Sequence, residues 1–148
     1  MNKVVKWFSD NFSKSTHKLD VAAQNRKLLY ESLELCYSAH SISKLKDLLN
    51  NSLKSFTVEQ RIRFSLEIVQ REQMIEYNKR KLKKCYYTAT EINELLQNTT
   101  RHFQCNAIQL HINQHREIYV HKGDDLSKYY KMVEDRKAFL IPDIEVQL

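Results

Sequence analysis

The scarcity of turn-forming residues is the feature that most constrains this chain. Its 148 residues include one glycine, Gly123, and one proline, Pro142, where average usage gives about ten and about seven. Tight β-turns need Gly, Asn or Pro at fixed positions, so an all-β sandwich or barrel is nearly excluded. A glycine-rich phosphate loop is excluded as well. The sequence therefore predicts a mainly α-helical protein, a single-domain bundle of five or six helices spanning residues 1–148.

Length and composition bound the class further. The length suits one domain with its own core, and 42% of the residues are hydrophobic. No apolar run approaches the ~18 residues of a membrane span, and the N-terminus lacks the apolar region of a signal peptide. Cys36, Cys85 and Cys105 are widely spaced and odd in number, which favours reduced thiols over a disulfide framework. We expect a cytoplasmic protein with no integral membrane association.

Apolar residues that recur with helical spacing predict the helix positions. Capping boxes at Thr57-Val-Glu-Gln60 and Thr88-Ala-Thr-Glu91 mark two helix starts. Ser41 and either Asp124 or Asp125 are further candidate N-caps. The expected helices are 2–13, 18–38, 42–53, 58–86, 89–103 and 125–140. A single uninterrupted helix over 57–103 is the alternative to a break near residues 86–87.

Residues 107–121 depart from the helical pattern. Ile108, Leu110 and Ile112 alternate with Gln109 and His111, and a period of two is typical of strands. We therefore predict a small β-hairpin near 107–121, with a helix as the alternative. Because Pro142 disfavours helical geometry in the residue before it, the tail 141–148 is expected to be extended.

A seven-residue apolar row suggests one route to self-association. The positions three beyond this row are polar, which weakens a coiled-coil seam. A homodimer through the seam is therefore kept as an alternative to a monomer. The row consists of Ile68, Ile75, Leu82, Ala89, Leu96 and Phe103.

The N-terminal segment has one apolar face and basic flanks. Such a helix either packs across the bundle or docks on a protein partner or a membrane surface. In the second case residues 1–14 form a docking helix that makes peripheral contacts. The docking candidates are Val4, Trp7, Phe8 and Phe12.

The net charge of +6 favours anionic partners. Positive charge gathers in the run from Lys79 to Lys84, which two tyrosines follow. Such a run displaces counterions from a phosphate backbone, and the tyrosines stack on unpaired bases. The alternative is a solvated basic helix face without a ligand. The nucleic-acid-binding candidates lie in the helix over 71–87: Arg71, Lys79, Arg80, Lys81, Lys83, Lys84 and Tyr87.

An arginine and a histidine separated by four residues, Arg116 and His121, precede the last predicted helix. Arginine holds a phosphate through two hydrogen bonds, and histidine exchanges a proton with a ribose 2′-hydroxyl. The pairing resembles the signature of HEPN domains, a family of small all-helical, mostly metal-independent ribonucleases and nucleotide-binding relatives. The resemblance covers residues 116–140 and implies that Arg116 and His121 are catalytic in a cleft between two protomers. The family usually has Asn, Asp or His where this chain has Glu117.

No metal or cofactor site is assigned from the sequence. The nearest pattern is His102-x-x-Cys105 followed by His111-x-x-x-His115. Zinc sites usually place two ligand pairs further apart and use more thiols, so we interpret these histidines as a polar face.

The sequence therefore favours a small basic helical interaction module, a regulator, adaptor or inhibitor that binds a macromolecular partner. The aromatic residues supply contacts typical of protein interfaces. A protein partner is expected, and an enzymatic role is the less favoured one. The alternatives are an RNA- or DNA-binding protein and a HEPN-like ribonuclease.

Overall fold

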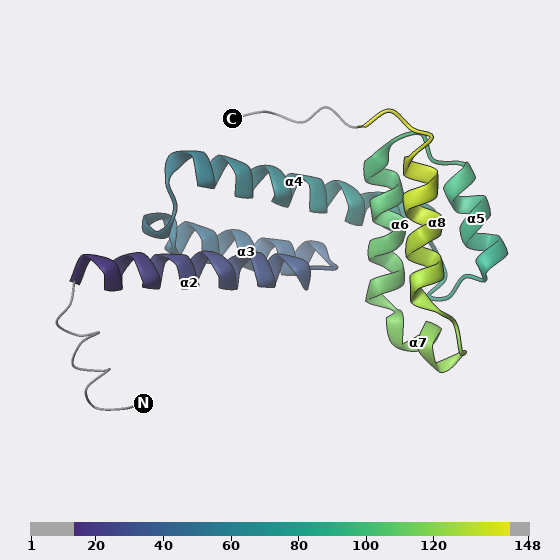
Figure 1. Ribbon diagram of the computed structural model, residues 1–148, viewed down its shortest axis with the longest axis horizontal. Helices are drawn as coiled ribbons and strands as arrows, with labels where there is room; N and C mark the ends of the chain where they lie inside the picture. Colours follow the sequence, from purple (N-terminus) through teal and green to yellow (C-terminus); the bar gives the residue numbers. More distant parts are fainter. Residues whose placement is uncertain (1–13, 143–148) are drawn as a thin grey trace.

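The computed structural model describes residues 14–142, with side chains from residue 20 onward, and it is all-α over that range (Figure 1). The predicted fold class is confirmed, with seven α-helices among the described residues where five or six were expected for the chain. The candidate docking residues Val4, Trp7, Phe8 and Phe12, and the tail beyond Pro142, lie outside the described residues. The elements are α2 (Lys14–Glu34), α3 (Ala39–Asn51), the 3-10 turn η1 (Leu53–Ser55), α4 (Val58–Lys81), α5 (Ala89–Gln97), α6 (His102–Gln114), α7 (Arg116–His121) and α8 (Leu126–Lys137).

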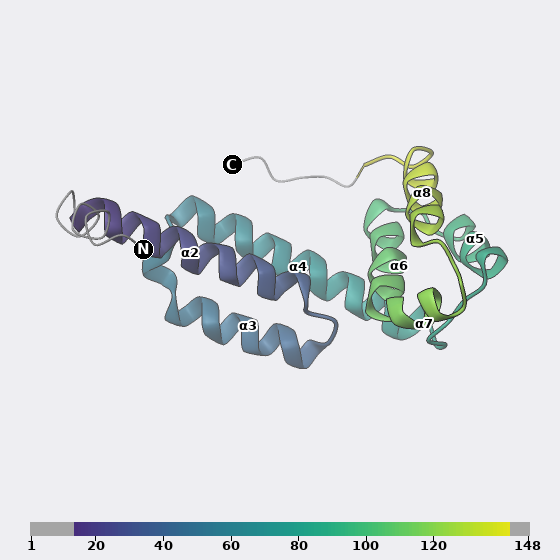
Figure 2. The ribbon, with the colours of Figure 1, turned by 60° about the horizontal axis from the view of Figure 1, so that its bottom comes forward.

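The N-terminal unit, residues 14–75, consists of α2, α3, η1 and the first part of α4. Its helices run side by side (Figures 1 and 2). The side chains of Asn25 and Arg26 in α2 bond to Ser55, which ties η1 to α2. The buried core of this unit is mainly aliphatic: Leu29, Leu33, Cys36, Ile42, Leu45, Leu49, Phe56, Phe64 and Ile68.

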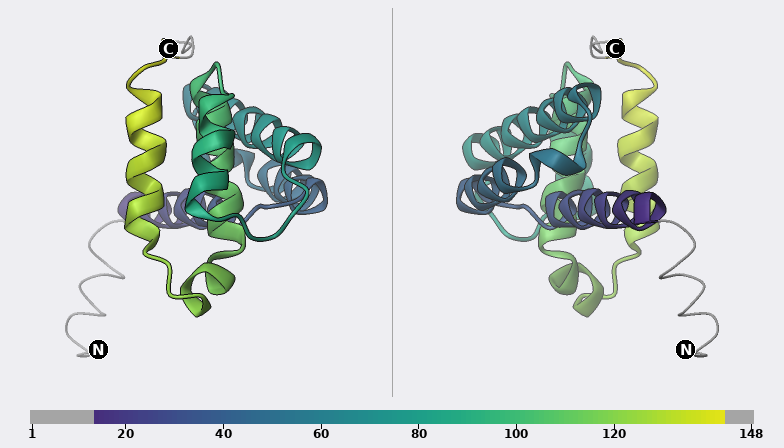
Figure 3. Two further views of the ribbon diagram at one scale, coloured as in Figure 1. Left: turned by 90° about the vertical axis from the view of Figure 1, so that its right-hand side faces the viewer. Right: turned by 90° about the vertical axis from the view of Figure 1, so that its left-hand side faces the viewer.

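The C-terminal unit, residues 76–142, has its own core. Helices α6 and α8 stand across the end of α4, and α5 packs beside them (Figures 1 and 3). The helix α4 belongs to both units, since its last turns enter this second core. The core residues are Tyr77, Leu82, Tyr87, Ile92, Leu96, Cys105, Ala107, Ile108, Ile112, Tyr119, Tyr129 and Val133.

Local capping signals place most helix starts. Both capping boxes are present, at Thr57 with Gln60 and at Thr88 with Glu91. Asp125 caps α8, as one of the two expected residues. The predicted cap of α3 was wrong: the hydroxyl of Ser38, rather than that of Ser41, accepts a hydrogen bond from a first-turn N–H (3.2 Å).

The ends predicted for the helices 18–38, 58–86 and 89–103 were too late by four to six residues. The helix α4 ends at Lys81 instead of residue 86, because Leu82 turns into the second core in an extended conformation. The helix α5 ends at Gln97. Just beyond it, the hydroxyl of Thr99 donates to the carbonyl oxygen of Leu96 (2.5 Å). The break between two helices in 57–103 is therefore confirmed, and a second break separates α5 from α6.

The predicted β-hairpin near 107–121 is wrong, since this segment forms α6 and α7. The helix α6 contacts α4, α5, α7 and α8, so it buries residues on several faces. A helix surrounded in this way carries apolar residues almost all round. The alternation of Ile108, Leu110 and Ile112 reflects that burial, not a strand.

The apolar row from Ile68 to Phe103 packs inside the chain. Ile68 belongs to the N-terminal core, and Leu82 and Leu96 belong to the C-terminal core. A homodimer would therefore have to use a different surface. Within the described range, no helix has the length and apolar character needed to cross a membrane.

A cationic pocket at the end of α4

The basic run at the end of α4 points in several directions. Consecutive residues of an α-helix lie about 100° apart around its axis, so Lys79, Arg80 and Lys81 cannot share one face. Arg80 approaches Glu76 (3.8 Å), and Lys79 lines a pocket with Lys83 and Lys84. The run therefore divides, and part of it converges with residues from elsewhere in the chain.

This pocket, which we call the cationic pocket, has a volume of about 460 Å³. It lies where the α2–α3 connection, the end of α4 and the end of α6 meet. Three lysines and two histidines line it, and Glu76 is the one carboxylate among its lining residues. The lining residues used below are Tyr37, Glu76, Asn78, Lys79, Lys83, Lys84, His111 and His115.

The loop that follows α4 holds two of the lysines. The ammonium of Lys83 donates to the carbonyl oxygen of Lys79 (2.6 Å). Lys84 bonds to the carboxylate of Glu91 and lies over the ring of Tyr87, 5.0 Å from its centroid. The hydroxyl of Tyr87 accepts a hydrogen bond from the backbone N–H of Lys84 (3.0 Å). These bonds fix the loop backbone, and Lys79 keeps an ammonium without an ion pair within residues 20–142.

Two histidines on α6 form the opposite wall. His111 is 6% exposed, and its Nε2–H donates to the carbonyl oxygen of Lys84 (2.8 Å). The ring of His115 lies 4.6 Å from it, centroid to centroid. Burial lowers the pKa of both rings, and the neighbouring His115 lowers that of His111 further. Both rings are therefore mainly neutral at pH 7 and act as hydrogen-bonding groups.

Asn78 contributes a buried acceptor to the same pocket. It is 8% exposed, and its Nδ2 donates to the carbonyl oxygen of Ala107 (2.7 Å). Its Oδ1 is buried and has no hydrogen-bond partner among the described residues. Buried polar atoms are normally paired with protein or water, so this acceptor has room for a donor.

Four of the seven candidates do not line the pocket: Arg71, Arg80, Lys81 and Tyr87. Arg71 donates to the carbonyl oxygens of Leu33 (2.9 Å) and Glu34 (3.0 Å). It therefore satisfies carbonyl groups at the end of α2, which a helix leaves unpaired. Tyr87 is 7% exposed and belongs to the C-terminal core, so little of its ring faces solvent.

Arg116 and His121 are the first and last residues of α7, and both are exposed. Five residues along a helix correspond to about 140° around its axis, so the two side chains diverge. The described part of the chain gives neither of them a side-chain hydrogen bond or an ion pair. Their catalytic assignment stays a prediction.

The residues with zinc-like spacing have separate partners. The ring of His102 bonds to the carbonyl oxygens of Lys137 (2.8 Å) and Leu140 (3.1 Å). Cys105 is buried against the hydroxyl of Thr99 (3.3 Å). In the part of the chain that the structure describes, no three His, Cys, Asp or Glu residues are grouped as metal ligands.

The sequence predicted the three lysines of the pocket as binding residues but not the histidines and the tyrosine that line its other sides. His111 and His115 were recognised as part of a histidine-rich stretch and assigned to a polar face, and Tyr37 gave no signal. Their approach to Lys79 depends on the crossing of α4 and α6, which no local pattern encodes. Comparisons with protein-family models, curated proteins and solved structures find no match to this chain.

Proposed function

We propose that the protein is a small interaction module that binds single-stranded nucleic acid through phosphate groups at the cationic pocket. The observation that carries this proposal is the convergence of Lys79, Lys83 and Lys84 with His111 and His115 around one concavity. The one carboxylate there, Glu76, already has Arg80 as a partner (3.8 Å). Glu91, which does not line the pocket, holds Lys84, so Lys79 and Lys83 are the lysines there without an ion pair among the described residues, and a phosphate would meet their charge.

The surroundings of the pocket favour a polyanion over a small anion. Arg80 and Lys81 leave the same helix end in other directions, so positive charge extends beyond the pocket. Successive phosphates of a strand gain from each such cation, because binding releases counterions. The rings of Tyr37 and His115 line the pocket beside the lysines and are only partly buried, and bases stack on such rings with little sequence preference.

The test is fluorescence anisotropy with a labelled uridine oligonucleotide and a thymidine oligonucleotide over a range of salt. The double variant Lys79→Glu/Lys83→Glu should weaken binding about tenfold or more. It should also lower the salt slope by about 1.4, since each phosphate contact to a single strand contributes ~0.7. Circular dichroism checks that the helices remain.

The matched control is Lys27→Glu/Lys54→Glu, which makes the same change in net charge on the N-terminal unit. Both of its lysines are exposed. Equal loss in the two double variants would show that net charge alone attracts the strand and would reject the pocket. Absence of binding by the unaltered protein at low salt would also reject it. Competition by inorganic phosphate alone at low concentration would point to a small anion instead.

A further inference from the structure

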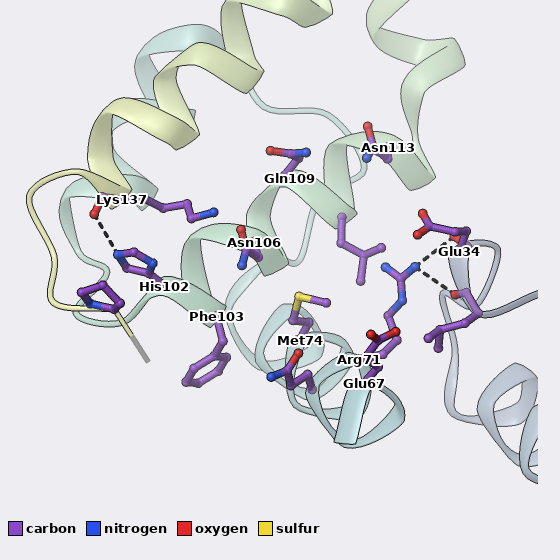
Figure 4. A pocket seen from close by; sticks show the side chains of 14 residues that line it. Glu34, Glu67, Arg71, Met74, His102, Phe103, Asn106, Gln109, Asn113 and Lys137 are labelled. Atoms are coloured by element: carbon purple, nitrogen blue, oxygen red, sulfur yellow. Dashed lines mark hydrogen bonds between the residues drawn. The ribbon is translucent and has the colours of Figure 1, made fainter. Parts of the chain in front are cut away.

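A second concavity lies between α4 and α6, and we call it the amide groove (Figure 4). Its volume is about 500 Å³. Apolar side chains line part of it, and Leu33 and Leu110 among them are buried. Met74 from α4 lies beside them. The groove therefore has an apolar base over which a ligand side chain can pack.

Four side-chain amides line this groove: Gln70, Asn106, Gln109 and Asn113. Within residues 20–142, the side chains of Gln70, Asn106 and Gln109 make no hydrogen bond, and Asn113 accepts one from the hydroxyl of Tyr130 (2.5 Å). Each amide offers a donor and an acceptor. A peptide backbone offers the same two groups at every residue other than proline.

The length of the groove matches a short extended chain. Its lining residues on α6 run from His102 to Asn113. Eleven residues of helix rise about 16 Å at ~1.5 Å each. An extended chain advances ~3.3 Å per residue, so about five residues would span the groove.

The two ends of the groove differ in charge. Lys137 and His102 lie at one end, and Glu34 lies at the other with Glu67 near it (Figure 4). The ring of His102 is already bonded to backbone, and Lys137 approaches Glu134 (3.4 Å).

At the acidic end the lining cation, Arg71, is bonded to backbone and not to a carboxylate. Neither Glu34 nor Glu67 has an ion pair within the described residues, although the Arg71 guanidinium is directed at the carbonyl oxygens nearby. Partial burial and the neighbouring Glu34 raise the pKa of Glu67. A cation placed at this end would relieve that repulsion.

We infer that the amide groove binds an extended peptide of a partner protein, about five residues long, with Lys or Arg at the Glu34–Glu67 end. The amides pair with the backbone of the peptide, and the apolar base receives one of its side chains. Residues 143–148 of this chain carry two acidic residues and no basic one. Pro142 lines the groove, but the tail that follows it supplies no cation for the acidic end, which favours a partner over the chain's own tail.

The experiment uses the full-length protein and an array of five-residue peptides in two matched sets. The sets share their sequences except for one terminal position, which is Arg in one set and Glu in the other. The protein should prefer the Arg set, and Glu34→Gln/Glu67→Gln should reduce that preference about fivefold or more. Asn106→Leu/Gln109→Leu should weaken both sets alike.

A matched control removes two carboxylates elsewhere, in Glu94→Gln/Glu117→Gln, and should keep the preference. Both residues are exposed and do not line the groove. Equal binding of the Arg and Glu sets, or equal loss in the control variant, would overturn the inference. A peptide with the sequence of residues 143–148 is included on the array. Its binding in preference to the Arg set would assign the groove to the chain's own end and would also overturn the inference.

Discussion

The two units of this protein bury their helices to different extents. In the N-terminal unit, apolar side chains remain exposed on α2, α3, η1 and α4. In the C-terminal unit, α5, α6 and α8 expose no large apolar residue within their bounds; the exposed ones lie outside them, at Ile118 and Val120 in α7 and at Phe139 and Ile141 after α8. The exposed residues of the first unit are Val21, Leu28, Leu35, Leu48, Leu53, Val58, Ile62 and Val69, with Tyr30 at the limit of exposure.

The side-chain hydrogen bonds of the two units also differ: tyrosine hydroxyl groups take part in several of those in the C-terminal unit, and amide and guanidinium groups donate several of those in the N-terminal unit. In the C-terminal unit the hydroxyl of Tyr119 accepts a hydrogen bond from the backbone N–H of Tyr87 (3.0 Å), and the hydroxyl of Tyr86 donates to Asp124 (2.6 Å). The rings of Tyr86, Tyr119 and Tyr129 follow one another at 4.7 and 5.4 Å between centroids. In the N-terminal unit Asn25 and Arg26 join α2 to Ser55, and Arg71 joins α4 to the end of α2.

This difference has a consequence for stability. In the N-terminal unit, each of the helices α2, α3 and α4 is covered by the others on one side only. In the C-terminal unit, four neighbouring helices surround α6. The N-terminal unit also depends on α4, whose last turns are held in the other core. Local opening costs least where buried apolar contacts are few, so we expect the N-terminal unit to open first.

The largest expected effect tests that order directly. Phe64 and Ile108 are fully buried in the two cores. Phe64→Ala should lower the free energy of unfolding by about 3–5 kcal/mol and Ile108→Ala by about 2–5 kcal/mol. Phe64→Ala should speed amide hydrogen exchange in α2 and α3 while α6 and α8 stay protected. Ile108→Ala should speed exchange in both units, because α4 loses its anchor. Uniform acceleration in Phe64→Ala would contradict the comparison.

An intermediate effect comes from the two capping boxes, which are matched in chemistry but lie in different units. Thr57 caps α4 and Thr88 caps α5. Each Thr→Ala change should cost about 1 kcal/mol, since one first-turn N–H loses its acceptor. In Thr57→Ala the faster exchange should be confined to the start of α4. In Thr88→Ala it should extend to residues 82–88, because Glu91 also holds Lys84. If both variants change only their own helix, the capping boxes do not distinguish the units.

The capping boxes also show how much of the fold the sequence predicts. A cap depends on atoms three residues apart, so Thr57 with Gln60 and Thr88 with Glu91 are visible in the sequence and present in the structure. The all-α class follows from the near absence of Gly and Pro. The hairpin prediction failed because a period of two in Ile108, Leu110 and Ile112 has two causes, a strand and a helix buried on several faces.

The candidate site was predictable only where it is local. Lys79, Lys83 and Lys84 are close in sequence, so the basic run identified them. His111 reaches the loop after α4 across 27 residues, through its bond to the backbone of Lys84. Tyr37 comes from the other side, in the α2–α3 connection. Such approaches depend on how α4 crosses α6, which is set by packing of the whole core.

The smallest expected effect concerns the pH dependence of the two units. Burial lowers the pKa of His111 below its value of about 6.5 in the unfolded chain. Below pH 6.5 the unfolded chain therefore binds a proton that the folded chain accepts only at lower pH, so stability falls as pH falls. His115 acts in the same direction, whereas Glu67 on α4 has a raised pKa and favours the folded state as pH falls towards 4.5. Between about pH 7.5 and 5.5, denaturant unfolding should show the unaltered protein losing more stability than His111→Gln. A parallel loss in both proteins would show that the buried ring does not couple the C-terminal unit to pH.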